Sequence, residues 1–362
     1  MSPHRIPWLV SDLPDAAALG PFLARIDAAR VYSNNGPLVQ ELEGVLAAMV
    51  QAYHPQAPAP FVVLASSGTT ALHMAAAASG APAGATATVP SFTFPATAHA
   101  LQHAGFQVEL ADVEAKTGTL SPTAVSTAAA GPVVPVAVFG SVLDTALWDN
   151  VAKATGRPVI IDAAASFPHQ APGQCCHVVV SFHATKPFGI GEGGALITTD
   201  PAMADRARKL ANFGFEDGVV HAVGLNAKMS ELHAAVGLAQ AQRWPDLAQA
   251  RADLWTAYRD ALPQNRIMPC LAGQAVAPAN LVLDCGDHAV DAVQQHLSAH
   301  GIGSRRLYTP GLHHHPWRRR QDQPCPVTEH LADCLISLPF HTRLTRADVC
   351  SIATAVRGLF GA

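Results

Sequence analysis

Residues 179–194 read VVSFHATKPFGIGEGG, and this segment decides how the chain is interpreted. An apolar stretch typical of a buried strand leads into Lys186, and a glycine-rich loop follows the lysine. Upstream, the apolar residues 158–161 end directly before Asp162. A lysine and an aspartate at the ends of neighbouring strands can hold pyridoxal phosphate (PLP), because the amine forms a Schiff base with the aldehyde and the carboxylate keeps the pyridine nitrogen protonated. Lysine is otherwise scarce and occurs only at positions 116, 153, 209 and 228.

Strand and helix patterns alternate between about residues 60 and 245. Strands are predicted at 61–65, 87–89, 107–110, 133–139, 158–161, 178–182 and 195–198, and helices at 70–79, 97–103, 145–154 and 201–212. Such alternation is typical of an α/β fold in which helices cover both faces of a mostly parallel sheet. Ligands of open α/β sheets bind at the carboxyl ends of the strands, where Asp162, His183, Lys186 and the turn at residues 66–70 all fall.

The pattern changes toward the C-terminus, where residues 229–262 predict one long helix. Strands are predicted beyond it at 280–283 and 335–338. We therefore expect a large PLP-binding domain at residues 1–245 and a smaller α+β domain at residues 246–362. Residues 310–326 are rich in His, Pro, Arg and Gln, which favours a mobile or partner-ordered loop with the basic run 318–320 in solvent.

Composition favours a globular enzyme over other classes of protein. The 362 residues are 49% apolar and 14% charged, and the net charge of −4 gives no electrostatic signal for nucleic acid or a membrane surface. No stretch approaches the roughly 18 apolar residues of a membrane helix, and the N-terminus lacks a signal-peptide pattern. The seven cysteines show no C-x-x-C spacing, which is typical of reduced thiols. We expect a soluble, cytoplasmic protein.

The turn at residues 66–72, SSGTTAL, joins a predicted strand to a predicted helix. Backbone N–H groups at a helix N-terminus, together with glycine and hydroxyl groups, suit a phosphate. Any capped helix has a similar pattern, but Lys186 and Asp162 make the cofactor phosphate the better interpretation. Phe94 can stack on the pyridine ring. The alternative is that Phe94 is an aromatic residue of the core, which Phe92 equally could be.

Two further patterns are rejected. Residues 189–194 match G-x-G-x-x-G, but a dinucleotide-binding motif opens a helix and here a strand pattern follows. The histidines at 313–315 suggest a metal, but adjacent residues cannot all face one ion, and no carboxylate or cysteine lies at ligand spacing in the sequence. We therefore expect neither NAD nor a metal.

Several motifs occur in a fixed order over almost the entire chain, at residues 34–37, 67–72, 92–94, 161–164, 181–186, 191–194, 224–235, 308–310 and 338–340. Together they resemble the nucleotide-sugar aminotransferases of the DegT/DnrJ/EryC1/StrS family. The resemblance implies fold type I of PLP enzymes. It also implies a homodimer whose active sites are shared between subunits.

The resemblance also implies residue roles, by matching position. Lys186 forms the Schiff base, Asp162 pairs with the pyridinium and Phe94 stacks on the ring. The residues implied to hold the cofactor phosphate are Gly68, Thr69, Thr70, Ser181 and, from the other subunit, Asn226. Two departures are visible: Ala165 stands where relatives often have Gln or His, and residues 187–190 lack the Thr or Asn that many relatives carry.

The implied reaction transfers the amino group of glutamate to a nucleotide-linked keto-sugar. The closest similarity is to enzymes that convert a dTDP-4-keto-6-deoxyhexose into a 4-amino-4,6-dideoxy sugar, and it rests on residues 34–37, 212–215 and 228–231. A 3-keto sugar, a cyclitol or a secondary-metabolite ketone stays open as substrate. Lys186 argues against a dehydratase, in which histidine replaces the lysine, and a non-catalytic binding or regulatory protein would be expected to lack Lys186 or Asp162. Arg305 and Arg306 are candidates for contact with a diphosphate.

Overall fold

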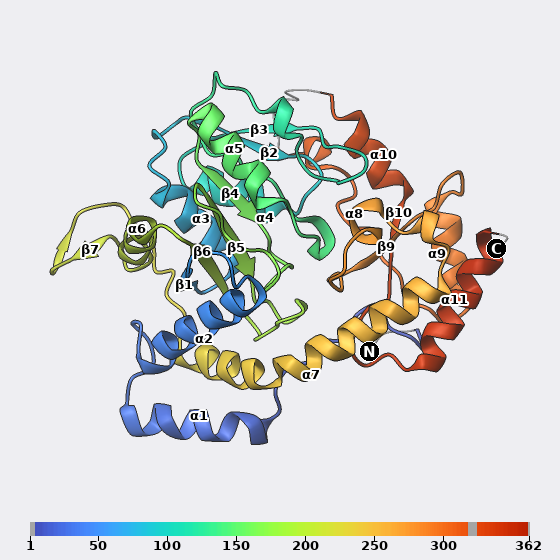
Figure 1. Cartoon of the computed structure of the whole chain (residues 1–362), viewed down its shortest axis with the longest axis horizontal. Helices are drawn as coiled ribbons and strands as arrows, with labels where there is room; N and C mark the ends of the chain where they lie inside the picture. The colour runs from blue at the N-terminus through green and yellow to red at the C-terminus, as the bar shows by residue number, and fades with distance from the viewer. Residues whose placement is uncertain (1–3, 318–323, 361–362) are drawn as a thin grey trace.

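The computed structural model describes residues 4–317 and 324–360, and Figure 1 shows a helix-covered sheet beside a second, smaller group of elements. Four strands lie side by side in the order β1 (Phe61–Ala65), β6 (Gly194–Thr198), β5 (Cys176–Ser181) and β4 (Val159–Asp162). β6 is antiparallel to both of its neighbours, whereas β5 and β4 are parallel. A further parallel pair consists of β2 (Thr86–Pro90) and β3 (Gln107–Ala111). Because β6 begins at Gly194, the glycine-rich segment leads into a strand and not into a helix.

The regular strand predicted at residues 133–139 is wrong. Val133 forms isolated bridges to residues of β2 and β4, so this segment lies between them and joins the two groups of strands into one sheet. Pro132 and Pro135 carry no N–H group, which prevents a continuous ladder of hydrogen bonds here. The chain then turns away as a short 3₁₀ helix at Val138–Gly140. The resulting sheet is mixed and mostly parallel, as predicted.

Side chains that alternate along β1 enter two different cores. Val62 and Leu64 pack into a core with α1 (Ala16–Ala29), α2 (Pro37–Tyr53), α5 (Thr145–Thr155) and the N-terminal part of α7 (Glu231–Ala261). Val63 and Ala65 pack into a core with α3 (Gly68–Ala78), α4 (Pro95–His103) and α6 (Pro201–Ala211). This period of two places helices on both faces of the sheet, which confirms the α/β prediction.

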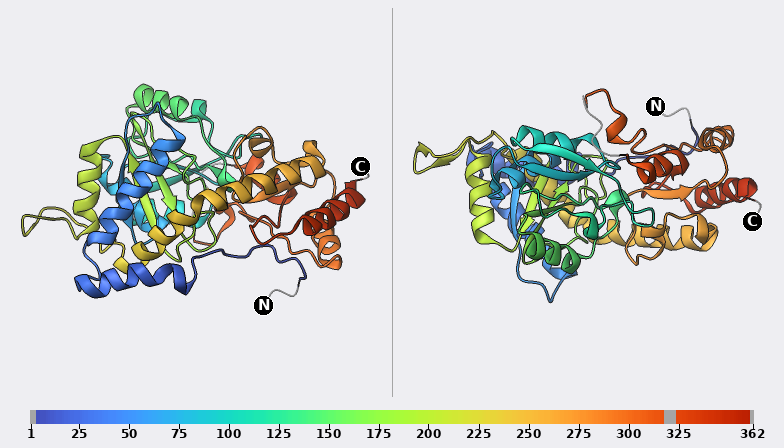
Figure 2. Two further views of the ribbon diagram at one scale, coloured as in Figure 1. Left: turned by 60° about the horizontal axis from the view of Figure 1, so that its bottom comes forward. Right: turned by 90° about the horizontal axis from the view of Figure 1, so that it is seen from above.

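A second group of elements surrounds the C-terminal part of α7 and buries Trp255 and Tyr258 in its own core. Its elements are α8 (Pro269–Ala272), β9 (Leu281–Asp284), α9 (Val290–Ala299), α10 (Pro326–Cys334), β10 (Leu335–Leu338) and α11 (Arg346–Phe360). β9 and β10 pair in the antiparallel sense. Figure 2 shows α7 as one long helix that reaches both groups. The domain division at residues 245 and 246 therefore falls inside a continuous helix, and it stays a prediction.

The N-terminal segment lies against the second group of elements. The Ile6 N–H donates to the Gly301 carbonyl oxygen over 2.9 Å, and the Gly303 N–H donates to the Ile6 carbonyl oxygen over 2.8 Å. Ile6 belongs to the same core as Trp255. This pairing carries the following residues toward the carboxyl edge of the sheet.

The remaining elements are short. A hairpin of β7 (Phe215–Glu216) and β8 (Val219–Val220) projects from the body beside α6 (Figure 1). Further 3₁₀ turns lie at Pro122–Ala124, Gln264–Arg266 and Leu312–His314. The predicted loop at 310–326 is described only in part, because residues 318–323, with the basic run 318–320, lie outside the described ranges. Within those ranges, no helix combines the length and apolar character needed to cross a membrane.

Candidate active site

A cavity with a volume of about 540 Å³ lies at the carboxyl ends of β4 and β5. The sequence-predicted residues that line it are Gly68, Thr69, Phe94, Asp162, Ser181 and Lys186. Thr70 and Asn226 were predicted with them but are not among the lining residues. The fold thus brings together residues that are more than one hundred positions apart in the chain, at the sheet edge where α/β proteins bind ligands.

Asp162 is the last residue of β4, and its side chain is buried in the floor of the cavity. The Thr97 hydroxyl donates to its Oδ2 atom over 2.7 Å, and the Ala164 N–H donates to its Oδ1 atom over 3.1 Å. Burial raises the pKa of the Asp162 carboxyl, while these two hydrogen bonds and the charge of Lys186 act in the opposite direction. A cationic partner in the cavity would favour the ionised form further.

Lys186 follows β5 in a turn closed by a hydrogen bond from its own N–H to the His183 carbonyl oxygen, over 2.8 Å. Burial lowers the pKa of the Lys186 amine, and the nearby Asp162 charge raises it. An amine with a lowered pKa is more often neutral at physiological pH, and the neutral form is the nucleophile and the base.

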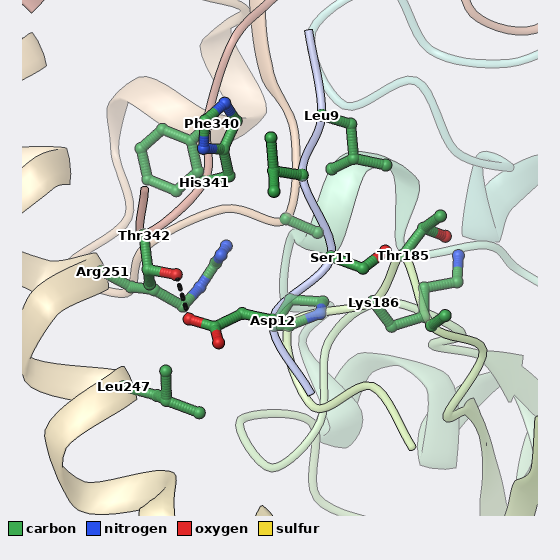
Figure 3. Close-up of a pocket in the computed structure, with 14 residues that line it drawn as sticks. Leu9, Ser11, Asp12, Thr185, Lys186, Leu247, Arg251, Phe340, His341 and Thr342 are labelled. Atoms are coloured by element: carbon green, nitrogen blue, oxygen red, sulfur yellow. Dashed lines mark hydrogen bonds between the residues drawn. The ribbon is translucent and has the colours of Figure 1, made fainter. Parts of the chain in front are cut away.

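The N-terminal segment lies beside the turn that contains Lys186. Figure 3 shows Leu9, Ser11 and Asp12 on a strand-like segment that passes between Lys186 and the residues around Thr342. The Thr342 hydroxyl donates to the Asp12 carboxylate over 2.7 Å, and the Arg243 guanidinium donates to it over 2.8 Å. These contacts tie the segment to both α7 and the C-terminal elements, so they help to fix the wall behind the lysine.

The N-terminus of α3 forms another wall. Ser67 caps the helix by accepting from the Thr70 N–H, and the Thr70 hydroxyl accepts from the Ser67 N–H over 2.9 Å. The Thr70 side chain is therefore used inside the helix cap, which explains why it does not line the cavity. The N–H groups of Gly68 and Thr69 belong to the first turn, where no intrahelical acceptor exists. Their direction and the helix dipole suit a phosphate group.

Gly68 fits this wall because a side chain there would collide with β5. A Cβ atom at Gly68 would lie 2.8 Å from the Ser181 Cβ atom and 3.1 Å from its Oγ atom. Glycine thus leaves the amides of the first turn and the Ser181 hydroxyl facing the same space. Together with Lys186 and Asp162, this cradle fits PLP at the phosphate, the aldehyde and the ring nitrogen.

The structure distinguishes Phe92 from Phe94, either of which could be a core residue on the sequence alone. Phe92 is fully buried and contacts the rings of Phe139 and Tyr308. Phe94, the N-cap residue of α4, is 65% exposed and lines the cavity. A large exposed aromatic at a cavity wall is available for stacking on a ligand ring, so Phe94 keeps its predicted position and Phe92 belongs to the core.

The two departures from the family pattern have different structural consequences. Ala165 lines the cavity, so its small side chain leaves open space near Asp162. Phe188 and Ile190, by contrast, are only 1% exposed and pack in the core beneath the sheet. Their side chains therefore support the position of the lysine turn instead of facing a substrate.

Asn226 is not among the residues that line its own chain's cavity, although the carbonyl oxygen of the next residue, Ala227, accepts from the Ser66 N–H over 2.7 Å. Asn226 is exposed and forms an isolated antiparallel bridge with Asn212 at the base of the β7–β8 hairpin. Asn226 does not lie at the N-terminus of a helix, since α7 begins at Glu231 and is capped by Ser230. A contact between Asn226 and a cofactor phosphate thus stays a prediction.

A carboxylate does lie beside the histidines at 313 and 314, although no carboxylate lies at ligand spacing in the sequence. The Nε2 atoms of His313 and His314 lie 3.2 and 3.1 Å from the same Glu329 carboxylate oxygen. Glu329 belongs to α10, so only the fold brings it close. The buried His313 ring is held on its other side by the Ser91 hydroxyl, 2.5 Å from Nδ1. Hydrogen bonds account for this cluster and fasten the loop to the end of β2.

Sequence reasoning missed several residues of the cavity. Thr97, which donates to Asp162, fell within the predicted helix at 97–103 but carried no motif of its own. Glu192 is another missed residue: it lies exposed at the opening, with its Oε1 atom 3.6 Å from Nε2 of His183, which the sequence did place at this edge of the sheet. Trp8 also lines the cavity, although the N-terminal region gave no signal in the sequence. Only the fold of the whole chain places these side chains at one site.

The model of the DegT/DnrJ/EryC1/StrS aminotransferase family matches residues 22–357. The chain belongs to this family. It is therefore a PLP-dependent aminotransferase of fold type I, and it belongs among the sugar aminotransferases. The order of the motifs and the cavity at the carboxyl edge of the sheet agree with that membership.

Two named relatives and one crystal structure are similar to this chain over most of its length. A dTDP-4-amino-4,6-dideoxy-D-glucose transaminase of Shigella dysenteriae is 28% identical, over 96% of this chain and 96% of the relative. A UDP-2-acetamido-2-deoxy-3-oxo-D-glucuronate aminotransferase of Pseudomonas aeruginosa is 29% identical, over 89% of this chain and 90% of the relative. The crystal structure of DesI in the presence of its TDP-sugar product superimposes with a TM-score of 0.84 at 30% identity, covering 99% of this chain and 96% of DesI.

Proposed function

We propose that this aminotransferase transfers the amino group of glutamate to a nucleotide-linked keto-sugar, and that its substrate is a dTDP-4-keto-6-deoxyhexose, which becomes a 4-amino-4,6-dideoxy sugar. The observation that carries the proposal is the cavity in which Lys186, Asp162 and the N-terminus of α3 meet. The Shigella relative supports amination at C4 of a dTDP-sugar, and DesI supports a TDP-linked sugar.

PLP, when bound, supplies an electron sink that stabilises the charge left on the α-carbon of an amino acid as a proton departs. The chain's own residues do the rest. Lys186 would hold the cofactor at its aldehyde group, and its neutral Nζ atom would accept the α-proton of the donor and return it. Asp162 would keep the ring nitrogen protonated through a charge-assisted hydrogen bond. The amides of Gly68 and Thr69 and the Ser181 hydroxyl would hold the phosphate, and Phe94 would cover the ring.

A 3-keto sugar is the second candidate substrate, and the Pseudomonas relative favours it because its own name specifies a 3-oxo UDP-sugar. Both reactions would use the same Lys186 and Asp162, so the sugar subsite alone distinguishes them. A cyclitol or another ketone would also use these residues. A non-catalytic protein on this scaffold is disfavoured because both residues persist and share one cavity.

A panel of ketones tests the substrate class directly. PLP-loaded protein with glutamate should aminate dTDP-4-keto-6-deoxyglucose, detected by mass spectrometry, with kcat/KM higher than for a UDP-linked 3-keto sugar or a free inosose. Faster amination of the UDP-linked 3-keto sugar would replace the C4 assignment. Amination of the inosose alone would contradict a nucleotide-linked substrate.

We further propose that the enzyme acts in the cytoplasm as a homodimer whose Asn226 reaches the cofactor phosphate of the partner subunit. No disulfide links cysteines within residues 4–317 and 324–360, which fits a reducing compartment. The β7–β8 hairpin beside Asn226 exposes apolar side chains, with Val219 and Val220 each 56% and Val223 96% exposed. Exposed apolar surface of this kind is typical of an interface.

Subunit exchange tests the role of Asn226 across the dimer. Lys186→Ala and Asn226→Ala enzymes should each be strongly impaired alone. After mixing and exchange, activity should rise above both parents, because each heterodimer then has one site with both changes and one site with neither. Native mass spectrometry verifies that heterodimers form. If verified heterodimers show no recovery, Asn226 acts within its own subunit or has no role in the site.

A further inference from the structure

Arg305 lies at the opening of the Lys186 cavity, and its position is fixed from two sides. Its backbone N–H donates to the Ser337 carbonyl oxygen over 3.1 Å, and the Ser337 N–H donates to the Arg305 carbonyl oxygen over 2.8 Å. Its guanidinium carbon lies 5.2 Å from the centre of the Trp8 ring. The Trp8 indole N–H in turn donates to the Ser337 hydroxyl over 3.0 Å. The hydrogen bond thus fixes the Trp8 ring, and the cation–π contact holds the guanidinium against that ring.

The neighbouring Arg306 is placed quite differently. Its guanidinium lies 3.3 Å from the Asp291 carboxylate and 3.1 Å from the Asp333 carboxylate, and it also donates to the Ala332 carbonyl oxygen. It does not line the cavity. Of the two arginines that the sequence offered for a diphosphate, Arg306 is therefore already paired within the second group of elements.

Within residues 4–317 and 324–360, no carboxylate forms an ion pair with Arg305. The other acidic and basic side chains discussed at the cavity have partners or roles: His183 lies beside Glu192, and Lys186 and Asp162 are assigned to the cofactor. Arg305 consequently presents an uncompensated, prearranged positive charge to whatever enters. The planar guanidinium favours bidentate contact with phosphate oxygens.

We propose that Arg305, positioned by Trp8, binds the diphosphate of a nucleotide-linked substrate. This inference rests on the proposed function and sharpens it, because a neutral cyclitol or free sugar offers no group for this charge. Trp8 is a positioning residue that acts through Arg305, because the Arg305 guanidinium lies over one face of the Trp8 ring. The carboxylate of the amino donor is the competing anion, and the two half-reactions distinguish it from a diphosphate.

The first measurement is calorimetric titration of PLP-loaded enzyme with dTDP. Arg305→Ala should weaken dTDP binding by roughly 10- to 100-fold, as expected for the loss of one charge-assisted contact. Arg305→Lys should recover part of this loss, because it keeps the charge but not the planar fork. Arg357→Ala removes an exposed arginine of α11 outside the cavity and should bind dTDP as the wild type does. Trp8→Leu should fall between wild type and Arg305→Ala.

The second measurement compares the two half-reactions. In Arg305→Ala, kcat/KM for the keto-sugar should fall at least roughly tenfold more than kcat/KM for glutamate, with most of the change in KM. Equal loss in both half-reactions would assign Arg305 to the donor carboxylate and overturn the proposal. Unchanged dTDP affinity in Arg305→Ala would overturn it while leaving the proposed function intact. A wild-type enzyme that reacts with glutamate but binds neither dTDP nor UDP would overturn both.

Discussion

Replacing Lys186 with alanine should lower the rate of the glutamate half-reaction by roughly 10²–10⁴-fold or more, the range associated with loss of a positioned acid–base group. Among the described residues that line the cavity, Lys186 is the sole lysine. Two other basic side chains line it: Arg305, whose guanidinium is not a proton acceptor at neutral pH, and His183, which faces Glu192 at the opening. Rapid mixing with glutamate, followed by the absorbance of the cofactor, measures this step in isolation.

The matched control for this change is Lys153→Ala, which removes an exposed lysine of α5. It should leave both the rate and the cofactor content unaltered. Lys186→Ala should still retain PLP to some extent, because the α3 amides and Asp162 remain. A Lys186→Ala enzyme that reacts with glutamate within a few-fold of the wild-type rate would show that another group moves the proton.

Asp162→Asn should leave the fold intact and remove most turnover, by roughly two or more orders of magnitude. An amide cannot stabilise a protonated ring nitrogen as a carboxylate does, and one charge-assisted contact at a buried site is worth a few kcal/mol. The Thr97 hydroxyl can still donate to the amide oxygen, so the local packing is preserved. Single-turnover rates with glutamate and circular dichroism of the same samples separate chemistry from folding.

Asp149→Asn serves as the control for losing a buried carboxylate elsewhere. Asp149 accepts the N–H groups of Gln174, Cys175 and Cys176 outside the cavity, so its replacement should lower Tm but not the rate per folded molecule. If Asp162→Asn instead reacts with glutamate at a near wild-type rate, a different acid must hold the ring nitrogen.

The sequence predicts those parts of the molecule that depend on local patterns. The strand at 61–65, the following helix and the positions of Asp162 and Lys186 at strand ends all agree with the structure. Each depends on apolar runs, capping residues and glycine turns that act over a few positions. The strand prediction for residues 133–139 is wrong because the apolar pattern there is that of a strand, but Pro132 and Pro135 lack the N–H donors that a regular ladder of hydrogen bonds needs.

Contacts between distant segments could not be predicted from local patterns. Arg305 and Arg306 are adjacent in the chain, yet one lies over Trp8 and the other between two aspartates. Glu329 meets His313 and His314 only because α10 returns to the end of β2. Nothing in the composition of the N-terminal segment indicates that it lines the cavity. Such placements depend on tertiary packing, which a single sequence does not reveal.

The most direct test of the assigned active site is to locate the covalent bond between protein and cofactor. PLP-loaded enzyme is reduced with borohydride and digested, and its peptides are mapped by mass spectrometry. We predict one phosphopyridoxyl adduct, on the peptide that contains Lys186, and its absence from Lys186→Ala treated in the same way. An adduct on Lys209 or Lys228 in the wild-type enzyme would contradict the assignment of the active site.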